Sequence, residues 1–131
     1  MLDFVTKEEL NLITEKIIGA AIEVHKYLGP GLFEQAYEKC LCQEFELRRI
    51  NFEKQKYMPV SYKGQTIDCS YRIDLIVESK VIVELKSVSS ILPIHKLQIL
   101  NYLKLSNMLL GLIINFNVPK LKEGIKRVIN G

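Results

Sequence analysis

Residues 72–86, R-I-D-L-I-V-E-S-K-V-I-V-E-L-K, limit the possible folds of this chain more than any other stretch. Two segments rich in valine and isoleucine, residues 73–78 and 81–87, flank the dipeptide Ser79-Lys80. Such side chains suit the half-buried face of a sheet, and a short polar break between two such segments is typical of a turn. The stretch therefore predicts a β-hairpin.

Three charged side chains fall inside these two predicted strands. Glu84 and Lys86 are two residues apart, so a strand places them on one face, and Asp74 lies across the hairpin from them. Burial of charges is costly unless they are paired. One explanation is a divalent cation such as Mg²⁺, which binds carboxylate oxygens together with waters and phosphates. The other explanation is an ion pair that braces the sheet, because charge clusters favour functional sites only statistically.

Length and composition indicate one globular domain over residues 1–131. The 131 residues are 48% hydrophobic and carry a formal net charge of +3, which is compatible with nucleic-acid binding but is weak evidence for it. The first ten residues carry three acids and no apolar segment, which argues against a signal peptide. Because no apolar run approaches the ~18 residues of a membrane span, we expect a cytoplasmic protein.

The N-terminal part predicts two helices. Thr6 and Glu9 form a capping box ahead of an apolar face, so the first helix should cover residues 7–27 and end at Gly29-Pro30-Gly31. A second helix is expected over residues 32–49. Its expected buried face comprises Phe33, Ala36, Tyr37, Cys40, Leu41 and Phe45.

Glu34 and the cysteines of this second segment allow simple explanations. Glu34 lies in the first helical turn, where the helix dipole favours a carboxylate whatever its function. Cys40, Cys42 and Cys69 are odd in number and lack a metal-binding spacing, so we expect reduced thiols, with Cys40 in the core.

Strand patterns fill most of the remaining chain. Residues 52–60 and 61–70 are expected as strands with a turn at Lys63-Gly64, ahead of the 72–87 hairpin. Residues 109–116 form a continuous apolar run of strand length, and residues 124–130 favour a short edge strand over a helix.

A third helix is expected over residues 93–107, because Pro93 suits a first helical turn. We assign its core face to Leu97, Leu100 and Leu103. The other side then carries His95, Gln98 and Tyr102, at spacings of three and four. On spacing alone, an exposed Gln98 and a core Tyr102 explain the pattern as well as a functional pair does.

The order of these polar residues resembles a known superfamily of nucleases. Asp74, Glu84-x-Lys86 and Gln98-x-x-x-Tyr102 resemble the PD-(D/E)xK nuclease superfamily, in its branch with RecB-type exonuclease motifs. Gly31-x-x-Glu34-x-x-Tyr37, within V-H-K-Y-L-G-P-G-L-F-E-Q-A-Y-E, resembles the GxxExxY protein family, as do the runs Q-I-L-N-Y-L-K and G-L-I-I-N-F. The resemblance covers residues 13–128. It implies an α+β fold with a restriction-endonuclease-like core, a central mixed β-sheet flanked by helices, in the order α-α-β-β-β-β-α-β.

The resemblance also implies a role for each motif residue. Glu34, Asp74 and Glu84 would hold Mg²⁺ or Mn²⁺, and the Leu85 carbonyl would add another oxygen ligand. Lys86 would lie near the attacking water. The pair Gln98 and Tyr102 would position substrate or active-site groups.

Two further positions bear on the resemblance. Ile73 stands where the superfamily's name would place a proline, but that position is loosely kept, so the difference weakens the resemblance little. His25 also fits the GxxExxY pattern. It would serve either as a contact near the site or, as we favour, as a helix-face histidine with satisfied hydrogen bonds.

The activity implied is metal-dependent hydrolysis of phosphodiester bonds in nucleic acid, with DNA the expected substrate. The alternative is a catalytically weak or inactive nucleic-acid-binding or scaffold module with the same fold, since so short a chain offers no extra element to grip a long duplex. A structural ion-pair cluster is the third interpretation. Whether RNA replaces DNA, and whether a homodimer forms, is left open by the sequence.

Overall fold

The computed structural model describes residues 5–131. The first four of the ten N-terminal residues that argued against a signal peptide lie outside the described residues. The chain forms an α+β domain with the following elements: α1 (Lys7–Leu28), α2 (Glu34–Leu47), β1 (Phe52–Tyr62), β2 (Gln65–Val77), β3 (Val81–Lys86), α3 (Pro93–Ser106), β4 (Leu110–Asn115), the 3-10 helix η1 (Leu121–Gly124) and β5 (Ile125–Ile129). The five strands form one mixed sheet in the order β1-β2-β3-β4-β5, in which only β3 and β4 run parallel. The predicted fold class is confirmed.

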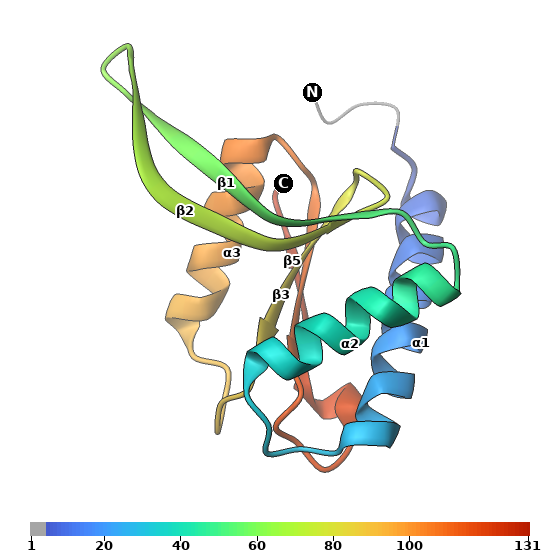
Figure 1. Ribbon diagram of the computed structural model, residues 1–131. Helices are drawn as coiled ribbons and strands as arrows, with labels where there is room; N and C mark the ends of the chain where they lie inside the picture. The colour runs from blue at the N-terminus through green and yellow to red at the C-terminus, as the bar shows by residue number, and fades with distance from the viewer. Residues whose placement is uncertain (1–4) are drawn as a thin grey trace.

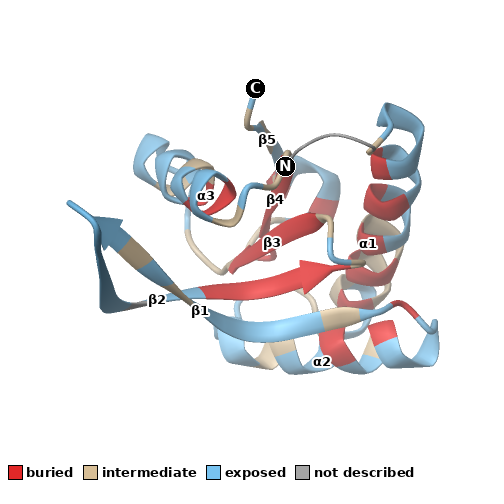
Figure 2. Ribbon diagram, turned by 90° about the horizontal axis from the view of Figure 1, so that it is seen from above, coloured by how far each residue is buried: buried red, intermediate tan, exposed pale blue. Residues whose placement is uncertain are grey.

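Helices cover both faces of this sheet (Figure 1). The larger apolar layer joins α1 and α2 to one face, with Ile17, Tyr37 and Leu85 among its fully buried members. The smaller layer joins α3 to the opposite face through Ile99, Ile82 and Ile113. Buried residues concentrate on β3, β4 and the inward sides of α1 and α2, whereas the tip of the β1–β2 hairpin is exposed (Figure 2). Among residues 5–131, no helix is both long and apolar enough to span a membrane.

The start of α1 follows the predicted capping pattern. The Thr6 hydroxyl accepts a hydrogen bond from Glu9 N at 3.1 Å, and the helix ends one residue beyond the predicted end. Gly29 and Gly31 then adopt positive φ angles of 68° and 97°, which an L side chain rarely tolerates. The tight α1–α2 turn therefore depends on both glycines.

The predicted buried face of α2 is partly wrong. The helix begins at Glu34, because Phe33 is the extended residue before it, and the Phe33 side chain is 88% exposed. Cys40 is exposed and Cys42 is buried in its place. Tyr37, Leu41 and Phe45 fix the core face, and either cysteine can border that face, so spacing alone did not decide between them. Burial raises the pKa of the Cys42 thiol to about 11, which keeps it protonated.

The predicted break between residues 61–70 and the following hairpin is also wrong, because both segments form the single strand β2. β1 pairs with β2 from Phe52↔Val77 to Tyr62↔Gln65, with the predicted turn at Lys63-Gly64 and a register shift between Met58 and Val60. The order is therefore α-α-β-β-β-α-β-β, with the predicted C-terminal edge strand present as β5. The hairpin forms an arm that extends beyond the body of the sheet (Figure 1).

The rotation of α3 differs from the prediction. Its buried residues are Ile99, Tyr102 and Leu103, whereas Leu97 is 54% exposed and Leu100 is half-buried. Apolar residues lie all round this helix, so their spacing did not fix which side faces the sheet. Gly111 of β4 determines which side of α3 faces the sheet, because a Cβ there would lie only 2.6 Å from Ile99 Cδ1. Ile99 occupies the space that the glycine leaves.

Candidate active site

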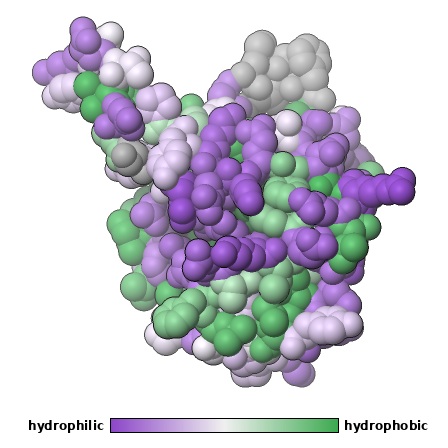
Figure 3. Space-filling model, in the orientation of Figure 1, coloured by the Kyte–Doolittle hydropathy of each residue, from purple (hydrophilic) through white to green (hydrophobic). Residues whose placement is uncertain are grey.

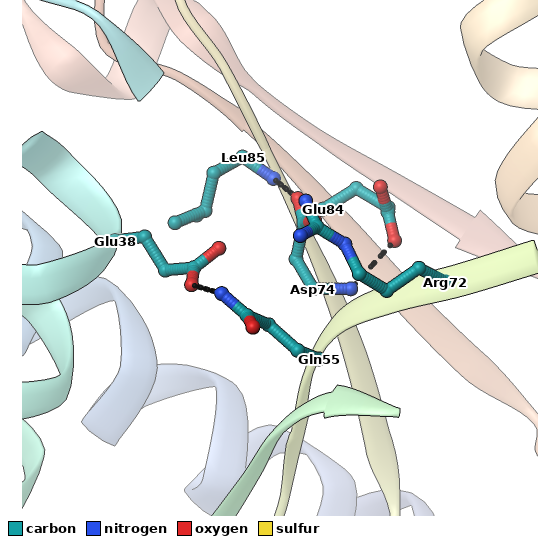
Figure 4. A network of polar contacts seen from close by, with 6 residues as sticks. All are labelled: Glu38, Gln55, Arg72, Asp74, Glu84 and Leu85. Atoms are coloured by element: carbon teal, nitrogen blue, oxygen red, sulfur yellow. Dashed lines mark hydrogen bonds and ion pairs between the residues drawn. The ribbon is translucent and has the colours of Figure 1, made fainter. Parts of the chain in front are cut away.

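The predicted meeting of Asp74 and Glu84 occurs where β2 and β3 begin to separate. Regular pairing runs from Val77↔Val81 to Leu75↔Val83. Next to these pairs, Asp74 N donates to Glu84 Oε1 at 3.2 Å, and Leu85 N donates to Asp74 Oδ2 at 2.9 Å. Side-chain oxygens thus satisfy backbone N–H groups at the junction, which fixes both carboxyl groups in position. Figure 4 shows both hydrogen bonds.

Both carboxyl groups are buried, and the pKa of each is raised above its ordinary value. Burial, followed by the charge of the neighbouring Asp74, raises the pKa of Glu84 to about 8. Burial also raises the pKa of Asp74, against the hydrogen bond from Leu85 N and the nearby positive charges of Arg72 and Lys86. The two acids lie side by side, and the positive charges near them do not offset the effect of burial.

A pocket of about 260 Å³ opens beside Asp74 toward α2. It is lined by Glu34, Gln35, Glu38, Gln55, Arg72, Asp74 and Leu85. Glu38 accepts a hydrogen bond from the Gln55 amide at 2.8 Å, and Arg72 Nη2 lies 3.6 Å from Asp74 Oδ1 (Figure 4). Of the four residues that the resemblance implied as metal ligands, Glu34, Asp74 and Leu85 line this cavity, whereas Glu84 is not part of its wall.

Lys86 ends β3 on the side that faces α3. Because side chains alternate along a strand, Glu84 and Lys86 lie on the same face as Ile82, which packs against α3. The Lys86 charge lowers the pKa of both Asp74 and Glu84, although it does not cancel the effect of burial. No carboxylate in residues 5–131 lies within ion-pairing distance of its ammonium group.

The GxxExxY segment forms the turn between α1 and α2, next to the pocket that Glu34 lines. The buried Tyr37 hydroxyl donates to Gly29 O at 2.6 Å and accepts from Leu32 N at 3.1 Å, and its ring stacks on Phe116 at 4.4 Å. Tyr37 thus locks the turn that precedes Glu34.

Two polar side chains tie the segment after β3 to its neighbours. The Ser87 hydroxyl donates to Leu32 O, which joins the end of β3 to the α1–α2 turn. The Asn115 side chain pairs with the backbone N–H and C=O of Val88 at 3.1 and 2.9 Å. The positions of Glu34 and Lys86 are therefore coupled through these contacts.

Gln98 and Tyr102 lie together on α3 but line a different cavity. Its volume is about 550 Å³, and its walls are Val60, Tyr71, Ile94, Leu97, Gln98, Asn101, Tyr102, Lys104 and Leu105. Gln98 is exposed, whereas Tyr102 is buried between this cavity and the carboxyl pair. Burial, then the charges of Glu84 and Asp74, raises the pKa of Tyr102, and its ring packs in one apolar cluster with Ile76 of β2 and Ile82 of β3.

His25 has the structural contacts that we favoured. Its Nε2 lies 2.9 Å from Val118 O, where it donates, and its ring lies against Phe116. It therefore fastens α1 to the segment after β4.

Sequence reasoning missed several residues of these two cavities. Glu38, Gln55 and Arg72 line the carboxyl pocket, and Tyr71 lines the other. Glu38 is four residues after Glu34 and Arg72 is two before Asp74, spacings that put each beside a predicted site residue. Gln55 and Tyr71 left no comparable signal, because their positions depend on how the arm crosses the helices.

The donors fit a hard divalent cation. Within residues 5–131, no group of three or more His, Cys, Asp or Glu side chains is gathered closely enough to hold a metal. Mg²⁺ does not need such a group, because it is commonly held by one or two carboxylates and completes its shell with waters and phosphate oxygens. Asp74, Glu84 and the Leu85 carbonyl would supply the protein ligands, and a cation would add positive charge beside the two buried acids.

A mixed sheet with a buried acid pair at a strand junction, a following lysine and helices on both faces defines a nuclease-like fold. The family model described as the PD-(D/E)XK nuclease superfamily matches residues 11–128, and the chain belongs to this superfamily. Neither the search of curated proteins nor that of solved structures found a match. Membership of the narrower GxxExxY family stays a prediction.

Proposed function

We propose that this protein is a metal-dependent nuclease that hydrolyses phosphodiester bonds, with DNA as its substrate. The observation that carries the proposal is the geometry of Asp74 and Glu84, two buried carboxyls fixed side by side, with Asp74 on the wall of a pocket that Glu34 also lines. A divalent metal bound there would polarise the scissile phosphate and lower the pKa of an attacking water. Asp74, Glu84 and the Leu85 carbonyl would hold this metal.

The other residues of the site have distinct tasks in this proposal. Lys86, on the same face as Glu84, supplies positive charge beside the attacking water and the reacting phosphate. Arg72 neutralises Asp74 in the metal-free protein and is 43% exposed on its side chain, so it can turn to a phosphate when metal takes its place. Glu34 or Glu38 of α2 would hold metal-bound waters at the pocket rim.

One observation favours a second candidate, a nucleic-acid-binding module without efficient cleavage. The Arg72 guanidinium already lies 3.6 Å from Asp74 and so competes with a metal for this carboxylate. In such a module the acid pair would be structural. Homodimer formation is compatible with both candidates.

Cleavage assays separate the two candidates. Labelled single-stranded and double-stranded DNA and RNA are incubated with Mg²⁺, Mn²⁺ or EDTA. We expect metal-dependent cleavage of DNA by the wild type and a loss of at least about a hundredfold in Lys86→Ala, on the scale of one electrostatic catalytic group. Lys122→Ala removes an equal charge from η1 and should cleave as the wild type does. Equal rates for wild type and Lys86→Ala, or none above the EDTA control, would refute the nuclease proposal.

A further inference from the structure

The cavity between α3 and the β1–β2 arm has a composition unlike that of the carboxyl pocket. Its walls combine apolar side chains with two tyrosine rings, the side-chain amides of Gln98 and Asn101, and one charged residue, Lys104. Its volume of about 550 Å³ lies within the range of small-molecule sites. In Figure 3, apolar side chains gather below the arm, on the side where α3 lies.

The two tyrosines form a corner at the inner end of this cavity. Tyr71 from β2 and Tyr102 from α3 meet edge to face, with ring centres 6.0 Å apart and planes at 73°. Tyr102 is buried, whereas Tyr71 is 43% exposed, so the Tyr71 ring offers a free face. Flat π systems stack on such a ring, and nucleobases are the flat groups that a nuclease meets.

The polar groups around the tyrosines suit the rest of a nucleotide. Amides such as Gln98 and Asn101 both donate and accept hydrogen bonds, as the Watson–Crick edge of a base does. The single charge, on Lys104, is positive and therefore complements a phosphate. Among the residues that the structure describes, no carboxylate lines this cavity.

The cavity also adjoins the carboxyl pair. Tyr102 contributes to the cavity wall and packs with Ile76 of β2 and Ile82 of β3, the strands that carry Asp74 and Glu84. A nucleotide in the cavity would thus place a neighbouring phosphate toward Glu84. Base edges inside a duplex are stacked and paired, so only an unpaired base can enter such a cavity.

We infer that the cavity between α3 and the arm binds an unpaired nucleobase, stacked on Tyr71, and that it directs the protein to single-stranded nucleic acid. This inference deepens the proposed function and rests on it for the choice of ligand. Lys104 and the amides of Gln98 and Asn101 would contact the same nucleotide.

Binding can be measured without cleavage. Fluorescence anisotropy in EDTA compares a labelled single-stranded DNA with a hairpin duplex of equal length, at one fixed low salt concentration, because salt weakens both. We expect tighter binding of the single strand. Tyr71→Ala should weaken it about tenfold, on the scale of one lost base stack, whereas Tyr71→Phe keeps the ring and should bind as the wild type does.

Two controls distinguish binding in the cavity from binding elsewhere on the β1–β2 arm. Tyr57→Ala removes an exposed tyrosine of β1 that is not part of the cavity wall, and should bind as the wild type does. An abasic site moved along the oligonucleotide should weaken wild-type binding at one position, and this dependence should vanish in Tyr71→Ala. Circular dichroism shows whether Tyr71→Ala remains folded.

The results also separate this inference from the nuclease proposal. Cleavage without any effect of Tyr71→Ala on binding would overturn the inference and leave the nuclease standing. Binding that depends on Tyr71, without cleavage, would support the inference in a binding module. Equal affinity for duplex and single strand would overturn the inference. A wild-type dimer that dissociates in Tyr71→Ala, without any DNA binding, would also overturn it and would indicate a second copy of the chain as the occupant of the cavity.

Discussion

Asp74 and Glu84 hold each other in place: Glu84 Oε1 accepts from Asp74 N at 3.2 Å, while Asp74 Oδ2 accepts from Leu85 N at 2.9 Å. The hydrogen bonds satisfy backbone groups, but ionisation of both carboxyls puts two like charges close together in a buried place. The arrangement therefore carries an electrostatic cost in the metal-free protein, and this cost depends on pH.

The first prediction concerns this pH dependence. The folded protein holds the Glu84 proton up to a pKa of about 8, against 4.5 for an ordinary glutamate. Between these two values the folded state binds more protons than the unfolded state, so the free energy of unfolding should fall as pH rises, by roughly a few kcal/mol. Glu84→Gln should flatten this slope and should be at least as stable as the wild type at pH 8.

Urea denaturation in EDTA between pH 5 and pH 8.5 measures the slope. The exposed Glu46→Gln on α2 serves as the matched control and should keep the wild-type slope. A loss of several kcal/mol in Glu84→Gln at pH 8, the size expected for a broken buried ion pair, would instead favour the structural ion-pair interpretation.

The second prediction concerns metal. Mg²⁺ or Mn²⁺ should raise the melting temperature of the wild type more at pH 8 than at pH 6, because protons compete for carboxyls of raised pKa. Asp74→Ala should lose the shift. Titration calorimetry checks the result, and identical binding heats for wild type and Asp74→Ala would contradict a metal site here. Glu34→Gln and Glu38→Gln, measured side by side, show which acid of α2 contributes.

The acid pair and its surroundings differ in how far the sequence predicted them. Alternation along residues 73–87 was enough to bring Asp74, Glu84 and Lys86 together, because strand geometry is local and a tight hairpin fixes the register. Gln55 and Tyr71 depend on how the β1–β2 arm crosses the helices, which local spacing does not specify. The division of residues 61–77 into two strands failed for a similar reason, since pairing with β1 keeps β2 continuous.

The third prediction concerns Tyr37. Tyr37→Phe keeps the stack on Phe116 but leaves Gly29 O and Leu32 N without their partner hydroxyl. We expect a loss of about 1–3 kcal/mol in the free energy of unfolding, the cost of unsatisfied polar groups in a half-buried turn. Tyr27→Phe, at an exposed tyrosine of α1, is the control and should change nothing. Unchanged stability of Tyr37→Phe would show that the turn holds without this hydroxyl.

The fourth prediction tests what sets the rotation of α3. Gly111→Ala would place a Cβ 2.6 Å from Ile99 Cδ1 and should destabilise the fold by about 1–3 kcal/mol through overpacking. Removing that methyl group with Ile99→Val in the same chain should restore part of the loss, so the two changes should not be additive. Additive losses in urea denaturation would mean that Ile99 does not fill the space above Gly111.

The last prediction concerns Gln98, which we expected on the side of α3 opposite a core face that includes Leu97. With Leu97 exposed, Gln98 instead lines the cavity next to Tyr102. We therefore expect Gln98 to contact the substrate and not the metal site. Gln98→Ala should raise KM for single-stranded DNA several-fold, with kcat, metal affinity and unfolding free energy nearly unchanged. Lys96→Ala, at an exposed position of α3 outside the cavity wall, is the control. A fall in kcat at unchanged KM would contradict this prediction and would mean that Gln98 acts in the chemical step.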